Sequence, residues 1–264
     1  MTILEIWLNG FLLSMVMLTA LWLVSVKMRN ASIIDPFWGF GFVVLAFFYL
    51  YATGNYSPRA ILITSLVTIW GLRLSIYLLW RSIGHGEDYR YQNFRQDYGP
   101  KRYWWISFFQ VFLLQGVLMT LVASTILCTI MASEASDLTV FDFLCMLIWL
   151  VGLSFEAGGD YQLTKFKKDK NNKGKVLNTG FWKYTRHPNY FGDTAIWWSF
   201  GLFSVISGSY YGLFGSLLMN ILLLKISGVS MLEKGLKKTK PQYQDYIERT
   251  HSFFPWFPKN KTEK

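Results

Sequence analysis

The sequence predicts an all-helical integral membrane protein, a bundle of seven transmembrane helices with the N-terminus outside and the C-terminus in the cytoplasm. Three observations lead to this prediction. Of the 264 residues, 52% are hydrophobic and only 16% are charged, whereas a soluble domain is about one-quarter charged. Seven apolar runs approach the roughly 20 residues that a helix needs to cross a bilayer. Basic residues gather in alternate connections between these runs.

The seven apolar runs are separated by polar connections. They lie at residues 4–26, about 33–53, about 60–80, about 104–132, about 138–157, about 190–206 and about 211–230. The first run is not expected to be a cleaved signal peptide, because no basic residues precede it and no small-residue cleavage site comes before Lys27. The second run opens with Asp35-Pro36, where Asp35 is either a functional acid or simply the N-cap of its helix.

Basic residues set the predicted orientation. All 26 Lys and Arg except Arg59, Arg73 and Lys225 follow the first run directly or lie in residues 81–103, in residues 162–187 or in the tail from Lys234. With seven spans these segments share one side of the membrane, and the positive-inside rule makes that side cytoplasmic. The net charge of +10 therefore indicates topology rather than a nucleic-acid partner. The expected location is the bacterial inner membrane, where membrane lipids surround the chain.

The chain is expected to form a single domain over residues 1–264, since no internal repeat is visible. Cys128 and Cys145 both fall in apolar runs and are interpreted as small core residues. Three scattered histidines and the absence of zinc-type spacing argue against a metal site.

Residues 178–193 concentrate the polar groups that suit an anion or a proton transfer. A lysine-rich stretch precedes them, and an apolar, aromatic run follows them. The polar side chains in this stretch are Tyr184, Arg186, His187, Asn189, Tyr190 and Asp193. A charged ligand can meet an apolar one at such a boundary. The alternative is a basic stop before a helix with Pro188 in its first turn, where Arg186 only sets topology.

Five ionisable residues lie in or beside the apolar runs, where such groups are costly and are candidates for function. They are Asp35, Arg73, Glu156, Asp160 and Lys225. Arg73, Tyr77 and Arg81 are spaced one helical turn apart and are expected to form one stripe in the wall of a polar pocket. The alternative for Arg73 is that its side chain extends to the lipid headgroups.

The pattern Tyr-x-Arg-His-Pro-Asn-Tyr-x-Gly-Asp at 184–193 resembles the C-terminal signature of steroid 5-alpha-reductase-like membrane proteins. It is similar in particular to their bacterial branch, catalogued as a domain of unknown function (DUF1295). The resemblance extends to Asp35-Pro36, to Arg73-x-x-x-Tyr77 at a similar spacing and to Asp160-Tyr161. It covers roughly residues 33–258 and is strongest in the signature region 160–198.

Two positions depart from the resembled pattern. In the steroid enzymes a tyrosine three residues before the arginine pairs with the catalytic carboxylate, and here that position is Trp70. The carboxylate is Asp35 rather than a glutamate. Asp35 is therefore expected to act alone or with a phenol from another helix, such as Tyr190.

The resemblance implies an NADPH-dependent reductase that acts on a carbon–carbon double bond conjugated to a carbonyl in a lipophilic, steroid-like or isoprenoid-like substrate. Asp35 and Tyr190 are the expected catalytic residues. Gly39-Phe40-Gly41 does not complete a classical dinucleotide motif, so the cofactor is expected within the bundle, facing the cytoplasm. The expected cofactor-binding residues are Arg73, Tyr77, Arg81, Asp160, Tyr184, Arg186, His187, Asn189, Asp193 and Trp197.

Two other function classes stay open. The short form Arg-His-Pro-x-Tyr also occurs in sterol reductases and in isoprenylcysteine carboxyl methyltransferases, which use S-adenosylmethionine. Glu233 would serve a methyltransferase as well, although Lys234 stands where those enzymes carry a second acid. A non-enzymatic lipid-binding or scaffold protein is the third class, and it would not need charges inside the membrane.

Overall fold

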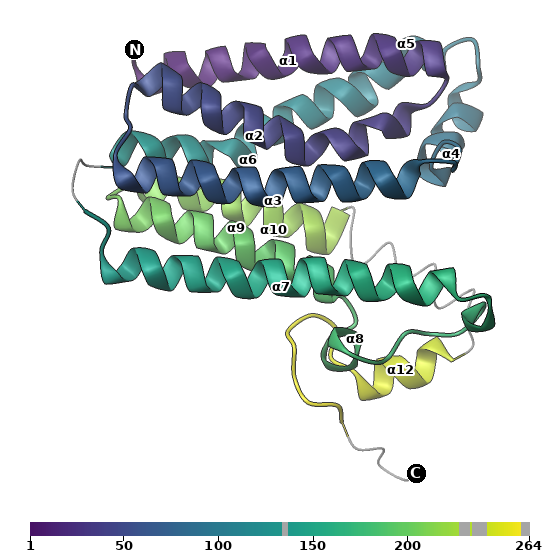
Figure 1. The fold of residues 1–264 in the computed structure, drawn as a ribbon. Helices are drawn as coiled ribbons and strands as arrows, with labels where there is room; N and C mark the ends of the chain where they lie inside the picture. The colour runs from purple at the N-terminus through teal and green to yellow at the C-terminus, as the bar shows by residue number, and fades with distance from the viewer. Residues whose placement is uncertain (134–136, 227–232, 234–241, 260–264) are drawn as a thin grey trace. The chain divides into compact units, whose positions relative to one another are not determined.

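The computed structural model describes residues 1–133, 137–226, 233 and 242–259, and every regular element among them is helical. Figure 1 shows the helices in chain order. The chain divides into two compact units, and each is described by itself. The first comprises Met1–Leu138 and Ser204–Gly215, and the second comprises Thr139–Phe203 and the described residues from Ser216 onward.

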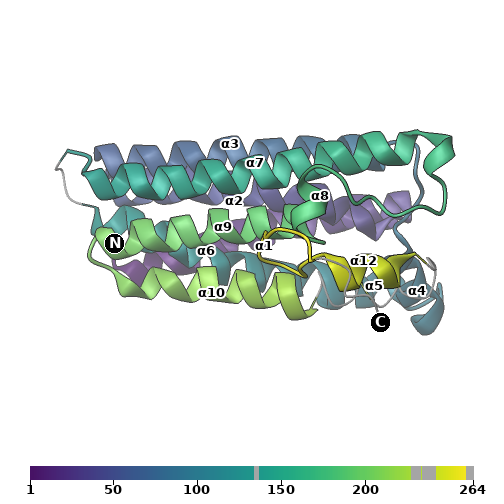
Figure 2. The ribbon, with the colours of Figure 1, turned by 90° about the horizontal axis from the view of Figure 1, so that it is seen from below.

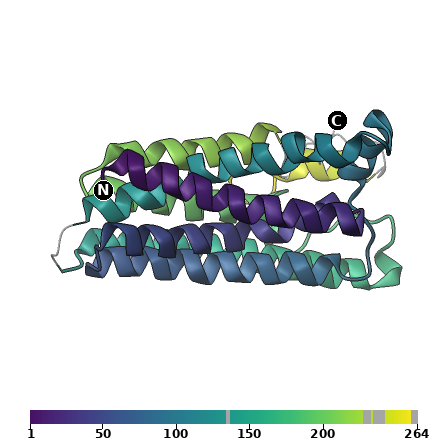
Figure 3. The same cartoon turned by 90° about the horizontal axis from the view of Figure 1, so that it is seen from above.

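The first unit is built on long helices that lie side by side in Figures 1 and 3. They are α1 (Ile3–Met28), α2 (Ile34–Thr53), α3 (Pro58–Ser82) and α6 (Leu114–Ala132), with the short helices η1 (Ala31–Ile33), α4 (Tyr89–Tyr98) and α5 (Tyr103–Ser107) at their ends. A π-helix, η2 (Phe108–Leu113), joins α5 to α6, and η4 (Tyr210–Gly212) packs on α6.

Two glycines allow α2 and α3 to approach closely. A Cβ atom built on Gly39 would collide with the carbonyl oxygen of Gly71, and one built on Gly71 would lie 2.5 Å from the carbonyl oxygen of Gly39. Small residues at a crossing are how membrane helices bring their backbones together. The α2–α3 contact is the most extensive between helices of this unit.

The longest helix among the described residues of the second unit is α7 (Val140–Lys168), and Figure 2 shows it and the shorter helices from below. These are η3 (Lys170–Asn172), α8 (Phe181–Tyr184), α9 (Pro188–Ile206), the part of α10 (Leu213–Ile221) from Ser216 onward, the π-helix η5 (Leu222–Ile226) and α12 (Tyr243–Arg249). A second glycine pair sets the α7–α9 crossing, because a Cβ on Gly152 would lie 2.7 Å from the carbonyl oxygen of Gly192.

Five helical stretches are long and apolar enough to cross a membrane, which confirms an integral membrane protein and the first five predicted runs. They are Ile3–Met28, Ala31–Thr53, Pro58–Ser82, Tyr103–Ala132 and Val140–Lys168. Helix α9 covers the sixth predicted run but is not among these five. The seventh run ends at residues 227–230, outside the described part of the chain. Seven spans, the orientation and the single domain stay predictions.

One alternative that the sequence left open is excluded, and one local expectation was wrong. Asp35 is not the N-cap of α2, because the helix begins at Ile34 with Ile33 as N-cap, and Asp35 lies inside the first turn. The connection expected over residues 162–187 is helical as far as Lys168. Lysine is a good helix former, and cations in a last turn interact favourably with the helix dipole. Pro188 begins α9, as expected for a proline in a first turn.

Candidate functional site

The predicted site residues divide between the two units. Asp35, Arg73, Tyr77 and Arg81 belong to the first unit, and the rest belong to the second. Each group is therefore described within its own unit.

The carboxylate of Asp35 is bound by two neighbouring side chains of α4. Arg90 Nη2 donates to Asp35 Oδ2 at 2.6 Å, and the Tyr91 hydroxyl donates to Asp35 Oδ1 at 2.7 Å. The helix that presents them is capped by Asp88, whose Oδ1 accepts from the Arg90 backbone N–H at 3.0 Å and from Arg90 Nε at 2.9 Å. The Asp35 carboxylate, in the first turn of α2, is thus paired with the Arg90 guanidinium and hydrogen-bonded by the Tyr91 phenol.

Burial and charge keep these α4 groups in defined protonation states. Burial raises the pKa of the Tyr91 phenol, and the adjacent Asp35 carboxylate raises it further, so the phenol retains its proton. Burial works against the charge of Arg90, but Asp35, Asp88 and Tyr91 together outweigh it, and the pKa of Arg90 is raised. Arg90 therefore stays a cation beside Asp35.

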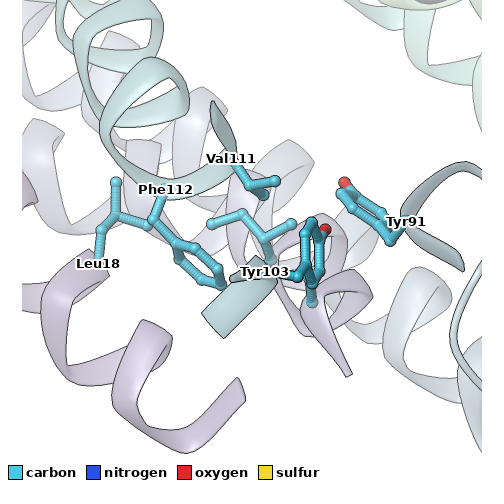
Figure 4. Packing of buried hydrophobic residues seen from close by; sticks show 7 residues of the cluster. Leu18, Tyr91, Tyr103, Val111 and Phe112 are labelled. Carbon is cyan, nitrogen blue, oxygen red and sulfur yellow. The ribbon is translucent and has the colours of Figure 1, made fainter. Parts of the chain in front are cut away.

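A hydrophobic cluster holds α4 in place. Tyr91 is only 5% exposed and packs in a cluster of buried side chains, shown in Figure 4. The other members of the cluster are Leu18, Ala31, Ile34, Tyr103, Val111 and Phe112. The Tyr91 hydroxyl is therefore positioned by apolar packing as well as by its hydrogen bond.

Trp70, at the position where the resembled family has tyrosine, is fully buried. Its indole packs on Phe42 with ring centroids 5.8 Å apart. The phenol that is hydrogen-bonded to Asp35 comes instead from Tyr91, which is 56 residues after Asp35 in the chain.

Arg73, Tyr77 and Arg81 form one stripe on α3, as predicted. The guanidinium carbons of Arg73 and Arg81 both lie 5.6 Å from the centroid of the Tyr77 ring. Tyr77 is thus flanked by two cations at the end of a candidate span.

In the second unit, Arg186 and His187 converge on one oxygen of Glu233. Arg186 Nε and Nη2 lie 2.9 and 2.8 Å from Glu233 Oε1, and His187 Nε2 lies 3.1 Å from the same atom. The hydrogen bond with His187, together with those from Arg186, lowers the pKa of Glu233 to about 2. Glu233 is therefore an anion throughout the neutral range.

The remaining nitrogen of Arg186 binds the C-terminal segment. Nη1 donates to the carbonyl oxygens of Thr250 at 2.7 Å and Ile247 at 3.2 Å. The backbone reinforces this contact, because Arg186 N–H donates to the His251 carbonyl at 2.9 Å. Three nitrogens of the Arg186 guanidinium thus have acceptors within the chain, which does not favour Arg186 as a phosphate ligand in this conformation.

Two further contacts attach the same segment to the signature. Thr185 Oγ1 donates to the Phe253 carbonyl at 2.7 Å, and Trp256 N–H donates to the Tyr184 carbonyl at 3.0 Å. The signature and residues 250–256 therefore lie against each other along their backbones.

The other predicted residues of this unit lie on α7 and α9. Asn189 Nδ2 donates to Asp160 Oδ1 at 3.2 Å, and the Tyr190 ring lies 5.9 Å from the His187 ring. Asp193 and Trp197 are buried and follow Asn189 at successive turns of α9. The structure thus brings Asp160 and Asn189 together, and Arg186 and His187 together through Glu233.

Buried polar atoms at two neighbouring positions of the signature, 187 and 189, have no hydrogen-bond partner among the described residues. They are His187 Nδ1 and Asn189 Oδ1. Buried polar atoms in folded proteins are almost always hydrogen-bonded, so these two are available to a ligand. Within the described ranges, no group of three or more His, Cys, Asp or Glu side chains is arranged to hold a metal ion.

The helical membrane-spanning segments and the signature define an integral membrane protein with a polar cluster beside its spans. The chain belongs to the family described as "Protein of unknown function (DUF1295)", which matches residues 21–250. It is also 26% identical over 277 residues to an uncharacterized protein of Schizosaccharomyces pombe, covering 93% of this chain and 78% of that protein. No solved structure matches the chain.

Family membership confirms the DUF1295 part of the predicted resemblance. The family description names no reaction, so the activity and the roles of the site residues stay proposals.

Sequence reasoning missed Arg90 and Tyr91 and gave Glu233 a role only in the alternative function. A signal for the first two exists, since Asp88 is a helix N-cap residue directly before a Tyr-Arg-Tyr sequence. It predicts a short helix but not which carboxylate that helix faces.

Proposed function

We propose that this protein is an NADPH-dependent reductase of a carbon–carbon double bond conjugated to a carbonyl, in a lipophilic, steroid-like or isoprenoid-like substrate. The observation that carries this proposal is the hydrogen bond between Tyr91 and Asp35. The resembled enzymes use a carboxylate–phenol pair, and here Asp35 and Tyr91 form such a pair. The phenol comes from α4 rather than from the position of Trp70 in α3.

Tyr91 is the proposed acid. Its phenol is buried and protonated, and the donor that polarises a substrate carbonyl must remain protonated until charge develops on the carbonyl oxygen. Asp35, held by Arg90, accepts the single hydroxyl proton of Tyr91 in the resting protein. A bound substrate carbonyl would replace Asp35 as the acceptor of that proton. The apolar cluster around Tyr91 leaves this side chain only 5% exposed.

The chain's polar groups fit a dinucleotide. Bound NADPH would supply the hydride. Arg73 and Arg81, on either side of Tyr77, offer guanidinium groups of the kind that bind phosphates. In the second unit, His187 Nδ1 and Asn189 Oδ1 are free to bind neutral polar groups. We assign Arg73 and Arg81 to the cofactor phosphates, and within the second unit we assign Asp160 to the orientation of Asn189.

The proposed topology has seven spans, with α9 and the region of α10 completing the set. Helix α9 contains 19 residues, which at about 1.5 Å per residue approaches the thickness of the hydrocarbon core. The basic segments then face the cytoplasm of a bacterial inner membrane, and so does the cofactor.

A direct assay tests the reductase proposal. Purified protein is incubated with NADPH and a lipid extract, and products are examined by mass spectrometry for a gain of two hydrogens. Tyr91→Phe should lower the rate by about 100-fold or more, whereas Tyr89→Phe, an exposed tyrosine on the same helix, should not. Equal rates for the two variants would remove Tyr91 from the reaction.

A second candidate, an S-adenosylmethionine-dependent methyltransferase, is favoured by one observation. Arg186 and His187 share the carboxylate of Glu233, and the Arg-His-Pro-x-Tyr sequence with a downstream glutamate also suits that class. Titration with each cofactor separates the two candidates, because the one that binds raises the melting temperature. A shift with S-adenosylmethionine and none with NADPH would replace the reductase proposal.

A further inference from the structure

A cavity of about 650 Å³ opens in the first unit, where three candidate spans meet the polar connections. Its wall contains Arg29 after α1, Glu87 and Arg95 in the α4 region, and Tyr103 and Trp104 of α5. None of these residues belongs to the proposed catalytic or cofactor groups.

One net positive charge remains in the wall of this cavity. Arg95 Nε and Nη2 lie 2.9 and 2.8 Å from the two carboxylate oxygens of Glu87, so this pair is neutral overall. Glu87 Oε1 also accepts from the Ala31 backbone N–H at 2.7 Å, which fixes the pair in place. The guanidinium of Arg29 and the Nη1 of Arg95 donate no hydrogen bond within the described part of the chain.

A buried hydroxyl in the same wall also has no partner. Tyr103 is 1% exposed, and its hydroxyl makes no hydrogen bond to any described residue. The guanidinium of Arg95 lies over its ring, 4.6 Å from the centroid. An unsatisfied buried hydroxyl costs free energy, and a ligand with acceptor oxygens would remove that cost.

The cavity's aromatic residues are typical of lipid headgroup depth. Trp104 is 52% exposed and stacks on Trp22 with ring centroids 6.3 Å apart. The Trp22 indole N–H donates to the Trp104 carbonyl at 2.9 Å. Tryptophan rings are enriched where membrane meets water.

We propose that this cavity binds the phosphate headgroup of an anionic phospholipid. The phosphate oxygens accept from Arg29, from Nη1 of Arg95 and from the Tyr103 hydroxyl, and the acyl chains leave along the exposed face of Trp104. The single net positive charge suits one phosphate diester. A lipid rather than a soluble phosphate ester is the expected source, because the cavity lies at the ends of three candidate spans.

The test measures the melting temperature of purified protein in detergent as dioleoyl-phosphatidylglycerol or dioleoyl-phosphatidylcholine is added. Phosphatidylglycerol should raise it saturably, while phosphatidylcholine and glycerol phosphate should not. Tyr103→Phe and Arg29→Gln should each weaken the phosphatidylglycerol affinity by about fivefold or more. Without lipid, Tyr103→Phe should melt no lower than the wild type, since the lost hydroxyl has no partner.

Two matched controls make the test specific. Tyr98→Phe changes an exposed phenol of α4, and Lys27→Gln changes a cation in the last turn of α1; neither lines the cavity. Both should bind phosphatidylglycerol within about twofold of the wild type. The proposal would be overturned if Arg29→Gln and Lys27→Gln, or Tyr103→Phe and Tyr98→Phe, lost the same phosphatidylglycerol affinity. It would also be overturned if glycerol phosphate raised the melting temperature as much as phosphatidylglycerol does.

Discussion

The phenolic oxygen of Tyr91 lies 2.7 Å from Asp35 Oδ1, although the two residues are 56 positions apart and belong to different helices. Arg90, the residue before Tyr91, binds the other carboxylate oxygen at 2.6 Å. Asp35 therefore accepts hydrogen bonds rather than donating a proton, and the proton donor nearest to it is the phenol.

Asp35→Asn tests this division of roles. Asparagine keeps the size of the side chain but removes the charge that holds Arg90 and orients Tyr91. We expect turnover to fall by about 100-fold or more, with NADPH binding near normal. The measurement pairs steady-state rates with a cofactor titration. Full activity in Asp35→Asn would show that the carboxylate has no part in the chemistry.

Arg186→Ala should destabilise the protein strongly. Arg186 is 9% exposed and pairs with Glu233, and removing one partner of a buried ion pair costs about 3–5 kcal/mol. Arg249→Ala is the control, because its pair with Asp245 is about half exposed and exposed pairs contribute about 0–1 kcal/mol. Melting temperatures of both variants give the comparison. A variant that melts lower but binds NADPH with unchanged affinity would assign Arg186 to stability alone.

The stabilisation by Glu233 should depend on pH in a defined direction. Folding lowers the pKa of Glu233 from 4.5 to about 2, so its contribution is fully present above pH 4.5 and is lost as the pH falls through about 2. The melting temperature of Glu233→Gln should lie below that of the wild type at neutral pH, and the gap should close toward pH 2. A gap that stays constant with pH would mean that the carboxylate charge is not what stabilises the fold.

Gly192→Ala should disturb the contact between α7 and α9. A Cβ at this position collides with the Glu156 backbone N and the Gly152 carbonyl oxygen, and neither backbone can move aside alone. Overpacking of this kind costs about 1–3 kcal/mol. Gly86→Ala is the control, because nothing lies within 4 Å of a Cβ there. Thermal melts should separate the two, and similar melting temperatures would contradict the close crossing.

Accessible tags test the proposed topology. A tag in the polar connection 81–103 and one in the C-terminal tail should be cytoplasmic, and a tag before Trp7 should be external. Labelling of single cysteines in intact cells with an impermeant reagent gives the measurement. A cytoplasmic N-terminus would require an even number of spans.

The sequence predicted the helices of this protein better than their contacts. Runs of apolar residues fix where a membrane helix forms, because every backbone group in lipid must bond within the segment. The stripe of Arg73, Tyr77 and Arg81 was predictable once the helix was, because residues four apart lie on the same face of a helix. The partners of Asp35 were not predictable, because they lie in a polar connection that folds back on the helix start.

Glu233 illustrates the same limit. It is 46 and 47 residues from His187 and Arg186, and no local pattern connects the three. The sequence suggested that Arg186 would be available for a phosphate, because the residues around Arg186 do not indicate which distant side chain it pairs with. The structure places its guanidinium on a carboxylate and two carbonyl oxygens.

The backbone pairing between the signature and residues 250–256 has a consequence for biosynthesis. Ribosomes make the chain from the N-terminus, so Tyr184, Thr185 and Arg186 leave the ribosome more than 60 residues before their partners. During that interval the backbone N–H and Nη1 of Arg186 and the hydroxyl of Thr185 lack the carbonyl acceptors that they have in the folded chain. Quality control of the newly made protein should therefore depend on the last part of translation, whichever order the membrane helices follow.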